Sequence, residues 1–385
     1  MNAAELLPPG PHWTSDDRAI AGSVLGFVQR TVAPFIQQWE DQGFLPDDLY
    51  TKAADIGLLG LGYPEQWGGT PCSSFARIAS TRALAEAGSG GLFAGLMSHS
   101  IALPPLLALG DDLFIRRIAP DVLAGKAKMA LAVTEPGGGS DVANLQTRAV
   151  RDGDSWVIDG DKAFITSGMR ADWLTVAVRT SGPGAGGVSI LMVEGDRPGL
   201  GKTALDKMGW RCSDTALLHF DGVRVPLDHL VGGEGLGFLG LMHNFNGERL
   251  GLAALAWSMA EVCWHDALDW ARTRQTFGKP LVARQVIRHK LVDLRMRIDA
   301  VRAYLEQVAW RIDRGDEPVA EVCMVKNLAT ATLEYVAGES LQILGGAGYV
   351  RGCRIERIFR ETKVLSIGGG ASEVLTDLAA RQLGL

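Results

Sequence analysis

The chain has 385 residues, of which 47% are hydrophobic, and it carries a formal net charge of −6 at pH 7. A chain of this length is expected to form two or three packed domains. The negative charge and the absence of any long basic run argue against a nucleic-acid partner. Residues 1–9 lack the pattern of a signal peptide, and no stretch of about 18 apolar residues occurs. We therefore expect a cytoplasmic protein without membrane insertion.

Residues 1–126 are expected to form an N-terminal helical domain. Apolar residues recur at helical spacing from Ile20 to Val32, and Asp16 and Asp17 stand where a helix cap is expected. Residues 63–69 contain proline and a glycine pair, which is typical of a loop, and residues 73–87 predict a further helix.

Residues 127–232 are expected to form a middle β domain. Short apolar runs alternate there with turns rich in glycine, aspartate and proline. Such short strands at intervals predict a small antiparallel β-barrel or sandwich. The predicted strands cover residues 128–134, 156–158, 173–178, 188–193 and 216–220.

Residues 233–385 are expected to form a C-terminal four-helix bundle. Long helices are predicted over about 235–274, 284–313 and 317–343, and a last helix begins at Ser372. Long apolar helices pack as a bundle and can bury a face against another subunit. The predicted fold class is thus mainly α with a central β domain.

Residues 133–141, Val-Thr-Glu-Pro-Gly-Gly-Gly-Ser-Asp, stand at the end of a predicted strand. Glycines after a strand let the backbone approach a flat ligand, while Thr134 and Ser140 offer hydroxyl groups. The segment is not a Walker A loop, because no Gly-Lys-Ser/Thr follows. A glycine-rich surface loop without a ligand is the alternative interpretation.

Other kinds of site find no support in the sequence. The seven histidines show no HxxxH or HxH spacing, so no metal site is predicted. The five cysteines form no CxxC pair and predict reduced thiols, and no G-x-S-x-G elbow of a serine hydrolase occurs.

Several segments together resemble the acyl-CoA dehydrogenase family over nearly the whole chain. Residues 133–141 are similar to its Thr-Glu-Pro-x-Ala-Gly-Ser-Asp motif, with Gly138 in place of alanine. Residues 162–168, Lys-Ala-Phe-Ile-Thr-Ser-Gly, resemble its Lys-x-Trp-Ile-Thr-Asn-Gly strand. Residues 272–281 resemble its Arg-x-x-Phe-Gly-x-x-Leu motif, and residues 342–349 and 367–373 resemble its C-terminal part. The order helix, β, helix is also that of the family's fold.

The resemblance implies an FAD cofactor. Thr134 would face the flavin ring, Phe164 would pack beside it, and Thr166 would bond near its reactive nitrogen. Arg274 would pair with the FAD pyrophosphate of a neighbouring subunit, because an arginine can donate two hydrogen bonds to a diphosphate at once. Ala371 stands where the family often has a threonine. The full set of implied cofactor residues is Leu131, Val133, Thr134, Gly139, Ser140, Phe164, Thr166, Arg274, Thr276, Phe277, Gln285, Gln342, Gly345, Gly346, Ala371 and Glu373.

The catalytic base is the point at which this chain departs from many members. They carry a glutamate where this chain has Gly369, whereas isovaleryl- and long-chain-type members place Glu before Arg on an earlier helix. This chain has that pair as Glu248 and Arg249. The resemblance therefore implies Glu248 as the base, with Gly369 still offering its backbone N–H. A solvated ion pair at a helix start is the alternative. The implied substrate residues are Ser140, Phe245, Asn246 and Arg249.

The implied activity is α,β-dehydrogenation of an acyl-CoA thioester, with electrons passed to an electron-transferring flavoprotein and the chain assembled as a homotetramer. Three alternatives keep the fold. They are an acyl-carrier-protein-linked dehydrogenase or oxidase of secondary metabolism, an oxygen-using flavin oxidase or monooxygenase, and a non-catalytic subunit of a hetero-oligomer.

Overall fold

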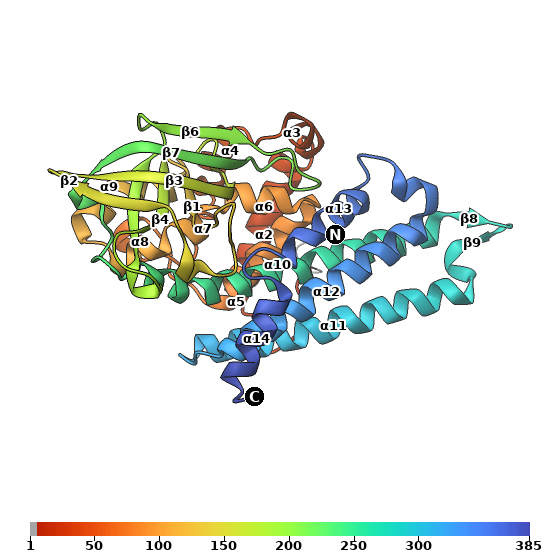
Figure 1. Cartoon of the computed structure of the whole chain (residues 1–385). Coiled ribbons are helices and arrows are strands. Elements are labelled where there is room, and N and C mark those ends of the chain that lie inside the picture. Colours follow the sequence, from red (N-terminus) through yellow and green to blue (C-terminus); the bar gives the residue numbers. More distant parts are fainter. Residues whose placement is uncertain (1–5) are drawn as a thin grey trace. The chain divides into compact units, whose positions relative to one another are not determined.

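The computed structural model describes residues 6–385, and the chain divides into two compact units. The first unit comprises Met1–Gln38, Cys72–Gly91 and Arg249–Leu385, and the second comprises Trp39–Pro71 and Leu92–Glu248. The expected order of helices, sheet and helices is confirmed, as Figure 1 shows. The boundaries expected for three domains, 1–126, 127–232 and 233–385, stay predictions.

The first unit begins with helix α2 (Ser15–Phe27), which continues into a π-helical turn η1 (Val28–Val32). Thr14 is the N-cap, and its side chain and that of Asp17 bond reciprocally to each other's backbone N–H. This capping box supplies acceptors for N–H groups that a helix start leaves unpaired. The predicted cap at Asp16 and Asp17 is therefore corrected to Thr14 with Asp17. Helix α5 (Ser74–Leu84) and turn η3 (Ala85–Ala87) confirm the helix predicted at 73–87.

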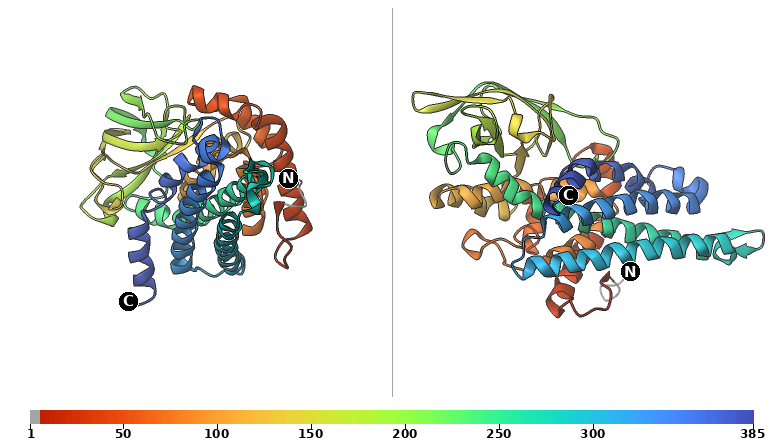
Figure 2. Two further views of the ribbon diagram at one scale, coloured as in Figure 1. Left: turned by 90° about the vertical axis from the view of Figure 1, so that its right-hand side faces the viewer. Right: turned by 60° about the horizontal axis from the view of Figure 1, so that its bottom comes forward.

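Long helices make up most of the first unit, as the sequence predicts. Figure 2 shows long helices running side by side, with a small hairpin of strands at one end. The predicted helices correspond to α10 (Gly237–Thr273), which enters this unit at Arg249, and to α11 (Gln285–Asp313), α12 (Val319–Leu344) and α14 (Ser372–Gln382). Helix α13 (Arg354–Leu365) was not predicted. The hairpin consists of β8 (Gln275–Thr276) and β9 (Lys279–Pro280).

The second unit combines short helices with one seven-stranded sheet. Its helices are α3 (Ile36–Gln42, from Trp39 on), α4 (Asp48–Asp55), α6 (Gly90–Leu96, from Leu92 on), α7 (His99–Ala102), α8 (Pro104–Leu109) and α9 (Asp112–Leu123). Its strands are β1 (Met129–Ala132), β2 (Arg148–Asp152), β3 (Ser155–Thr166), β4 (Trp173–Arg179), β5 (Val188–Glu194), β6 (Leu200–Ala204) and β7 (Thr215–Pro226).

The sheet contains the expected antiparallel pairings, and also parallel ones. The strand order is β1-β4-β2-β3-β7-β6, and β5 pairs with β4. Strands β2 with β3, β3 with β7, β7 with β6 and β4 with β5 are antiparallel. Strands β1 and β2 both pair with β4 in parallel. The chain just after β1 nevertheless lies beside β3, because Ala163 of β3 donates its backbone N–H to the carbonyl of Thr134.

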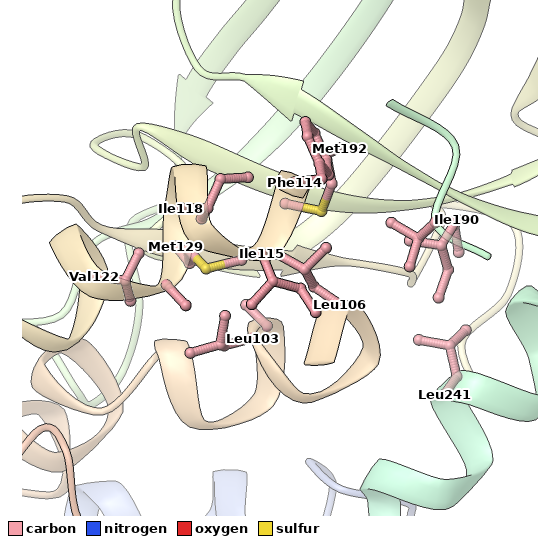
Figure 3. Close-up of a cluster of buried hydrophobic side chains, with 14 of the residues drawn as sticks. Leu103, Leu106, Phe114, Ile115, Ile118, Val122, Met129, Ile190, Met192 and Leu241 are labelled. Carbon is pink, nitrogen blue, oxygen red and sulfur yellow. The ribbon is translucent and has the colours of Figure 1, made fainter. Parts of the chain in front are cut away.

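One hydrophobic core of the second unit lies between helices α7 to α9 and one face of the sheet. Figure 3 shows Leu106 and Ile115 among Met129 of β1 and Met192 of β5. Another core packs the opposite set of strand side chains, including Trp156 and Phe220, within the sheet. Because consecutive strand residues point to opposite faces, the nearly continuous burial of β4 and β5 is what two cores require.

Within residues 6–385 the five cysteines are free, and no group of three or more His, Cys, Asp or Glu side chains is arranged to hold a metal ion. No single helix in that part of the chain is long and apolar enough to cross a membrane, although two bent helix pairs meet the length and composition test.

Candidate functional site

The glycine-rich segment begins where strand β1 ends, as predicted. Glu135 and Gly138 exchange two backbone hydrogen bonds of 3.1 Å, which makes a tight turn of Pro136 and Gly137. A Cβ atom added at Gly137 or Gly138 would have no neighbour within 4 Å, and Ser140 is exposed. The tip of this loop is therefore open for contact with a ligand, on the backbone and on the Ser140 hydroxyl.

The base of the loop is closed by the carboxylate of Glu135, which is only 8% exposed. Its two oxygens accept the backbone N–H groups of Gln146 and Thr147 at 2.6 and 2.8 Å. Arg179 of β4 holds the end of the loop at residues 143–145, because its guanidinium donates to the carbonyls of Ala143 and Leu145. Side chains thus shape both limbs of the loop.

Lys162 of β3 joins this loop to the second motif. Its side chain is fully buried, and Nζ donates to the Val133 carbonyl at 3.0 Å and to Glu135 at 2.9 Å. The next residue, Ala163, donates its backbone N–H to the Thr134 carbonyl at 2.8 Å. Burial lowers the pKa of Lys162 to about 8, although Glu135 favours the ammonium form. Burial raises the pKa of Glu135, but Lys162 and the hydrogen bonds outweigh it, so that its net shift is downward.

A break in the register of β3 turns Phe164 outward. The pairing with β7 shifts between Lys162 and Ile165, and Phe164 has a φ of 59° and a side chain that is 68% exposed. An extra residue in one strand re-aims a side chain in this way, and left-handed φ is unfavourable for a bulky residue. Strained backbone that presents an aromatic ring to its surroundings points to a function. Thr166 pairs with Thr215 at the end of the strand.

The hairpin β8–β9 carries the residues expected at the adenosine end of a cofactor. Phe277 is at its tip with a φ of 49° and is 97% exposed, and the Arg284 guanidinium lies 5.5 Å from its ring centroid. The Thr276 hydroxyl is buried without a hydrogen-bond partner in the part of the chain that the structure describes. Arg274 and Gln285 flank the hairpin and are exposed.

The C-terminal end of α12 carries Gln342, Gly345 and Gly346. All three are exposed, and Gly345 has a φ of 61°, which begins the 3-10 turn η8 (Gly345–Tyr349). Figures 1 and 2 show the hairpin and this turn at the same end of the long helices. The expected cofactor residues on the hairpin and at the end of α12 therefore gather at one end, whereas Ala371 and Glu373 lie at the start of α14.

The turn with Gly369 lies elsewhere in the first unit. Arg249, which is buried, donates from Nε to the Gly369 carbonyl at 3.2 Å. Lys326, fully buried on α12, donates to the next carbonyl, that of Gly370, at 2.9 Å. Burial raises the pKa of the Cys323 thiol, while the nearby cations Arg249 and Lys326 oppose this shift. Two buried cations thus hold consecutive carbonyls of this turn.

The backbone N–H of Gly369 makes no hydrogen bond within residues 6–385, and the residue has a φ of 67°. The N–H is thus available to a ligand. Ala371 follows as the N-cap of α14 without a side-chain hydrogen bond, and Glu373 is exposed in the first turn of that helix.

The residues at the hairpin end and the residues at the Gly369 turn lie far apart along α12. Gly345 lies 19 residues beyond Lys326, which at about 1.5 Å per residue is roughly 28 Å. Within one chain, the hairpin end and the Gly369 turn therefore cannot grip the same part of a ligand.

The predicted base and the predicted substrate residues other than Ser140 lie on α10. Glu248 is half-buried and ends the second unit, and Arg249 begins the first. Phe245 packs against the core of the second unit, and Asn246 is half-buried. The pair is in the interior of α10, which corrects the expectation that it begins a helix.

Three polar residues at these sites were missed by the sequence interpretation, although two of them stand in the quoted motifs. They are Glu135, Lys162 and Lys326. A charged residue within a mostly apolar segment, as in Met324-Val325-Lys326-Asn327-Leu328, is a weak signal of a buried charge.

Comparison with known proteins gives consistent matches along the chain. Models of the N-terminal, middle and C-terminal domains of acyl-CoA dehydrogenase match residues 14–126, 130–223 and 235–384. The structure of a probable acyl CoA dehydrogenase from Mycobacterium abscessus has a TM-score of 0.95 and 48% identity over 97% of this chain and 100% of that chain. The acyl-CoA dehydrogenase AFT10-1 of Alternaria alternata is 32% identical over 97% of this chain and 93% of its own length. The mitochondrial long-chain specific acyl-CoA dehydrogenase of Rattus norvegicus is 33% identical over 96% and 87%.

Proposed function

Because this chain belongs to the acyl-CoA dehydrogenase family and is an oxidoreductase of that kind, we propose that it removes the α- and β-hydrogens of an acyl-CoA thioester, with Glu248 as the proton acceptor. The observation that carries the proposal is the Gly369 turn. Its side chain is absent, its N–H is available, and its carbonyl is held by Arg249, the residue that follows Glu248. The turn can therefore polarise a substrate but cannot supply a base.

The family uses FAD, and the residues present fit such a group. The second unit offers an open glycine turn, the Ser140 hydroxyl and the outward ring of Phe164, which suit a flat, polar ring system. The hairpin offers an exposed guanidinium at Arg274 and an aromatic ring at Phe277, which suit a diphosphate and a purine. Bound FAD would supply the acceptor for the β-hydrogen, which leaves as hydride.

The chain's own residues would act on the thioester as follows. The Gly369 N–H donates a hydrogen bond to the thioester carbonyl and stabilises the charge that develops on its oxygen. This polarisation makes the α C–H more acidic, and the Glu248 carboxylate takes the proton. Arg249 holds the turn through the Gly369 carbonyl, so the donor need not reorganise during the reaction.

We also propose that the chain works as a homo-oligomer, a tetramer by analogy with the family. The separation of roughly 28 Å along α12 favours this, because the hairpin end is then free to reach a second chain's cofactor. The electron acceptor is proposed to be an electron-transferring flavoprotein, and the location cytoplasmic.

Anaerobic titration of the purified protein with a panel of acyl-CoA thioesters tests the proposed function. Bleaching of the bound flavin would identify the substrate and show dehydrogenation together. Bleaching that occurs only with acyl-carrier-protein thioesters would favour the carrier-protein alternative, and fast reoxidation by air would favour an oxidase. A colourless protein that does not take up FAD would contradict the proposal.

The variant Glu248→Gln tests the base. The amide keeps the size of the carboxylate but cannot take the α-proton at neutral pH, so flavin reduction by the best thioester should fall by about two to four decades. FAD should stay bound, and the thioester should still bind. Reduction at the wild-type rate would assign Glu248 a structural role and leave the base among other carboxylates.

A further inference from the structure

We propose that Lys162 and Glu135 form a positioning pair that holds the loop of residues 135–146 in a shape ready for the cofactor. The inference rests on the proposed function in one respect, namely that this loop binds FAD. It adds that the loop is shaped by a buried ion pair outside the exposed tip, and that this pair acts on cofactor affinity more than on folding.

The pair contacts both the start and the far end of the loop. Lys162 holds the Val133 carbonyl and Ala163 holds the Thr134 carbonyl, so consecutive residues of β3 fix the two residues before the loop. Glu135 then gathers the N–H groups of Gln146 and Thr147 from the loop's far end. Removal of the pair would release the Val133 carbonyl at the entry of the loop and the two N–H groups at its far end, while the backbone bond of Ala163 would remain.

Burial of the two charges opposes folding. Moving a lysine and a glutamate out of water is unfavourable, and well-packed apolar residues in such places often give a fold that is as stable or more so. The lowered pKa of Lys162 shows that burial acts against its charge here. The stability of the fold therefore does not explain why Lys162 is fully buried. The need to fix the shape of the loop does explain it.

The tip of the loop depends on the base of the loop for its shape. Its tip has glycines with open space around them, so few contacts of its own hold it. A loop already ordered at its base loses less conformational entropy when a ligand binds. Arg179 holds residues 143 and 145 without the help of Lys162 or Glu135. Loss of the pair should therefore loosen the part of the loop that follows β1, while the sheet stays folded.

The test measures FAD affinity in Glu135→Gln, Lys162→Met and the double variant, with the holoprotein purified first. Glu135→Gln keeps the shape of the side chain but turns an NH₂ group toward one of the two backbone N–H donors. Each single variant removes hydrogen bonds to a charged group that hold the loop, so each should bind FAD about ten-fold or more weakly. Because the pair acts as a unit, the double variant should lose much less than the product of the two single effects.

Arg82→Met is the matched control. Arg82 is also a buried cation, 1% exposed, and bonds to Glu86 at 2.7 Å within the first unit, whereas this loop belongs to the second unit. It should lower the thermal unfolding temperature without changing FAD affinity. The proposal is overturned if the loop variants fold and bind FAD within two-fold of wild type, or if they lose no more FAD affinity than Arg82→Met.

A second measurement on the wild-type protein does not depend on the folding of any variant. After removal of FAD, hydrogen exchange should still find the amides of Gln146 and Thr147 protected, because Glu135 accepts both. Free exchange of these amides in the apoprotein would show that FAD, and not the pair, shapes the loop. Failure of the wild-type protein to bind FAD at all would instead contradict the proposed function.

Discussion

At the scale of single residues, two phenylalanines of the proposed site combine left-handed backbone with an exposed ring. Phe164 and Phe277 both have positive φ, and both have exposed rings. Left-handed backbone costs about 1–2 kcal/mol for a residue with a Cβ atom. Burial of the ring does not offset this cost at either residue, so we propose that each ring contacts a bound partner.

Replacement of Phe164 tests this interpretation. Phe164→Gly removes the left-handed strain and Phe164→Ala keeps it, so the glycine variant should be the more stable of the two apoproteins by about 1 kcal/mol. Both variants should retain FAD less well, because both lose the ring. Urea unfolding and flavin fluorescence measure the two effects. Equal FAD retention in wild type and both variants would remove Phe164 from the cofactor site.

Lys162 predicts a specific pH dependence of stability. Its pKa is about 8 in the folded protein, because burial disfavours the charge, and its ordinary value is 10.5. Between these values the unfolded chain binds a proton that the folded chain lacks, so this group's contribution to the free energy of unfolding rises with pH, by at most about 1.4 kcal/mol per pH unit. The contribution is lost as pH falls through 8.

Comparison with Lys162→Arg from pH 7 to 10 isolates this contribution, because arginine stays charged throughout. Wild type should gain stability relative to the variant above pH 8 in urea unfolding of the apoprotein. Parallel pH profiles would show that Lys162 keeps its proton in the folded state.

At the scale of elements, helix α14 begins without a side-chain cap. Ala371 is its N-cap, with ψ of 149° and no hydroxyl to accept an N–H of the first turn. Ala371→Thr should supply that acceptor and stabilise the protein by about 1 kcal/mol. Ala371→Val is the control, since it has the same shape without the hydroxyl. An increase in stability with valine as large as that with threonine would contradict the capping explanation.

At the scale of the whole molecule, the hairpin end should serve a neighbouring chain's cofactor. Arg274→Glu should weaken FAD retention, because it places a carboxylate opposite a diphosphate. Arg272→Glu, a change of the same charge at another exposed arginine of this segment, should have little effect. Sedimentation of both variants measures their oligomeric state, and so distinguishes dissociation of the subunits from loss of a contact with the cofactor. Equal FAD retention in the two variants would show that Arg274 does not contact the pyrophosphate.

Much of the fold could be predicted because its signals are local. The long helices α10, α11 and α12 follow from apolar spacing, and β4 and β5 follow from nearly continuous apolar runs. Strands β2 and β6 were missed because they are mostly exposed and carry few apolar residues. Helix α13 was missed because polar residues such as Arg357 and Glu361 are buried on it, where they bond to backbone groups of residues 87–90.

Motifs and periodicity lie in neighbouring positions, so they were enough to identify the family and the order of the elements and to propose site residues. The side chains that hold those motifs in place could be identified only in the folded chain. Lys162 reaches Glu135 and Lys326 reaches Gly370 across 27 and 44 residues of chain. Whether a charge is buried depends on such distant partners and on the surface they remove from water, and neither is encoded in the spacing of adjacent residues.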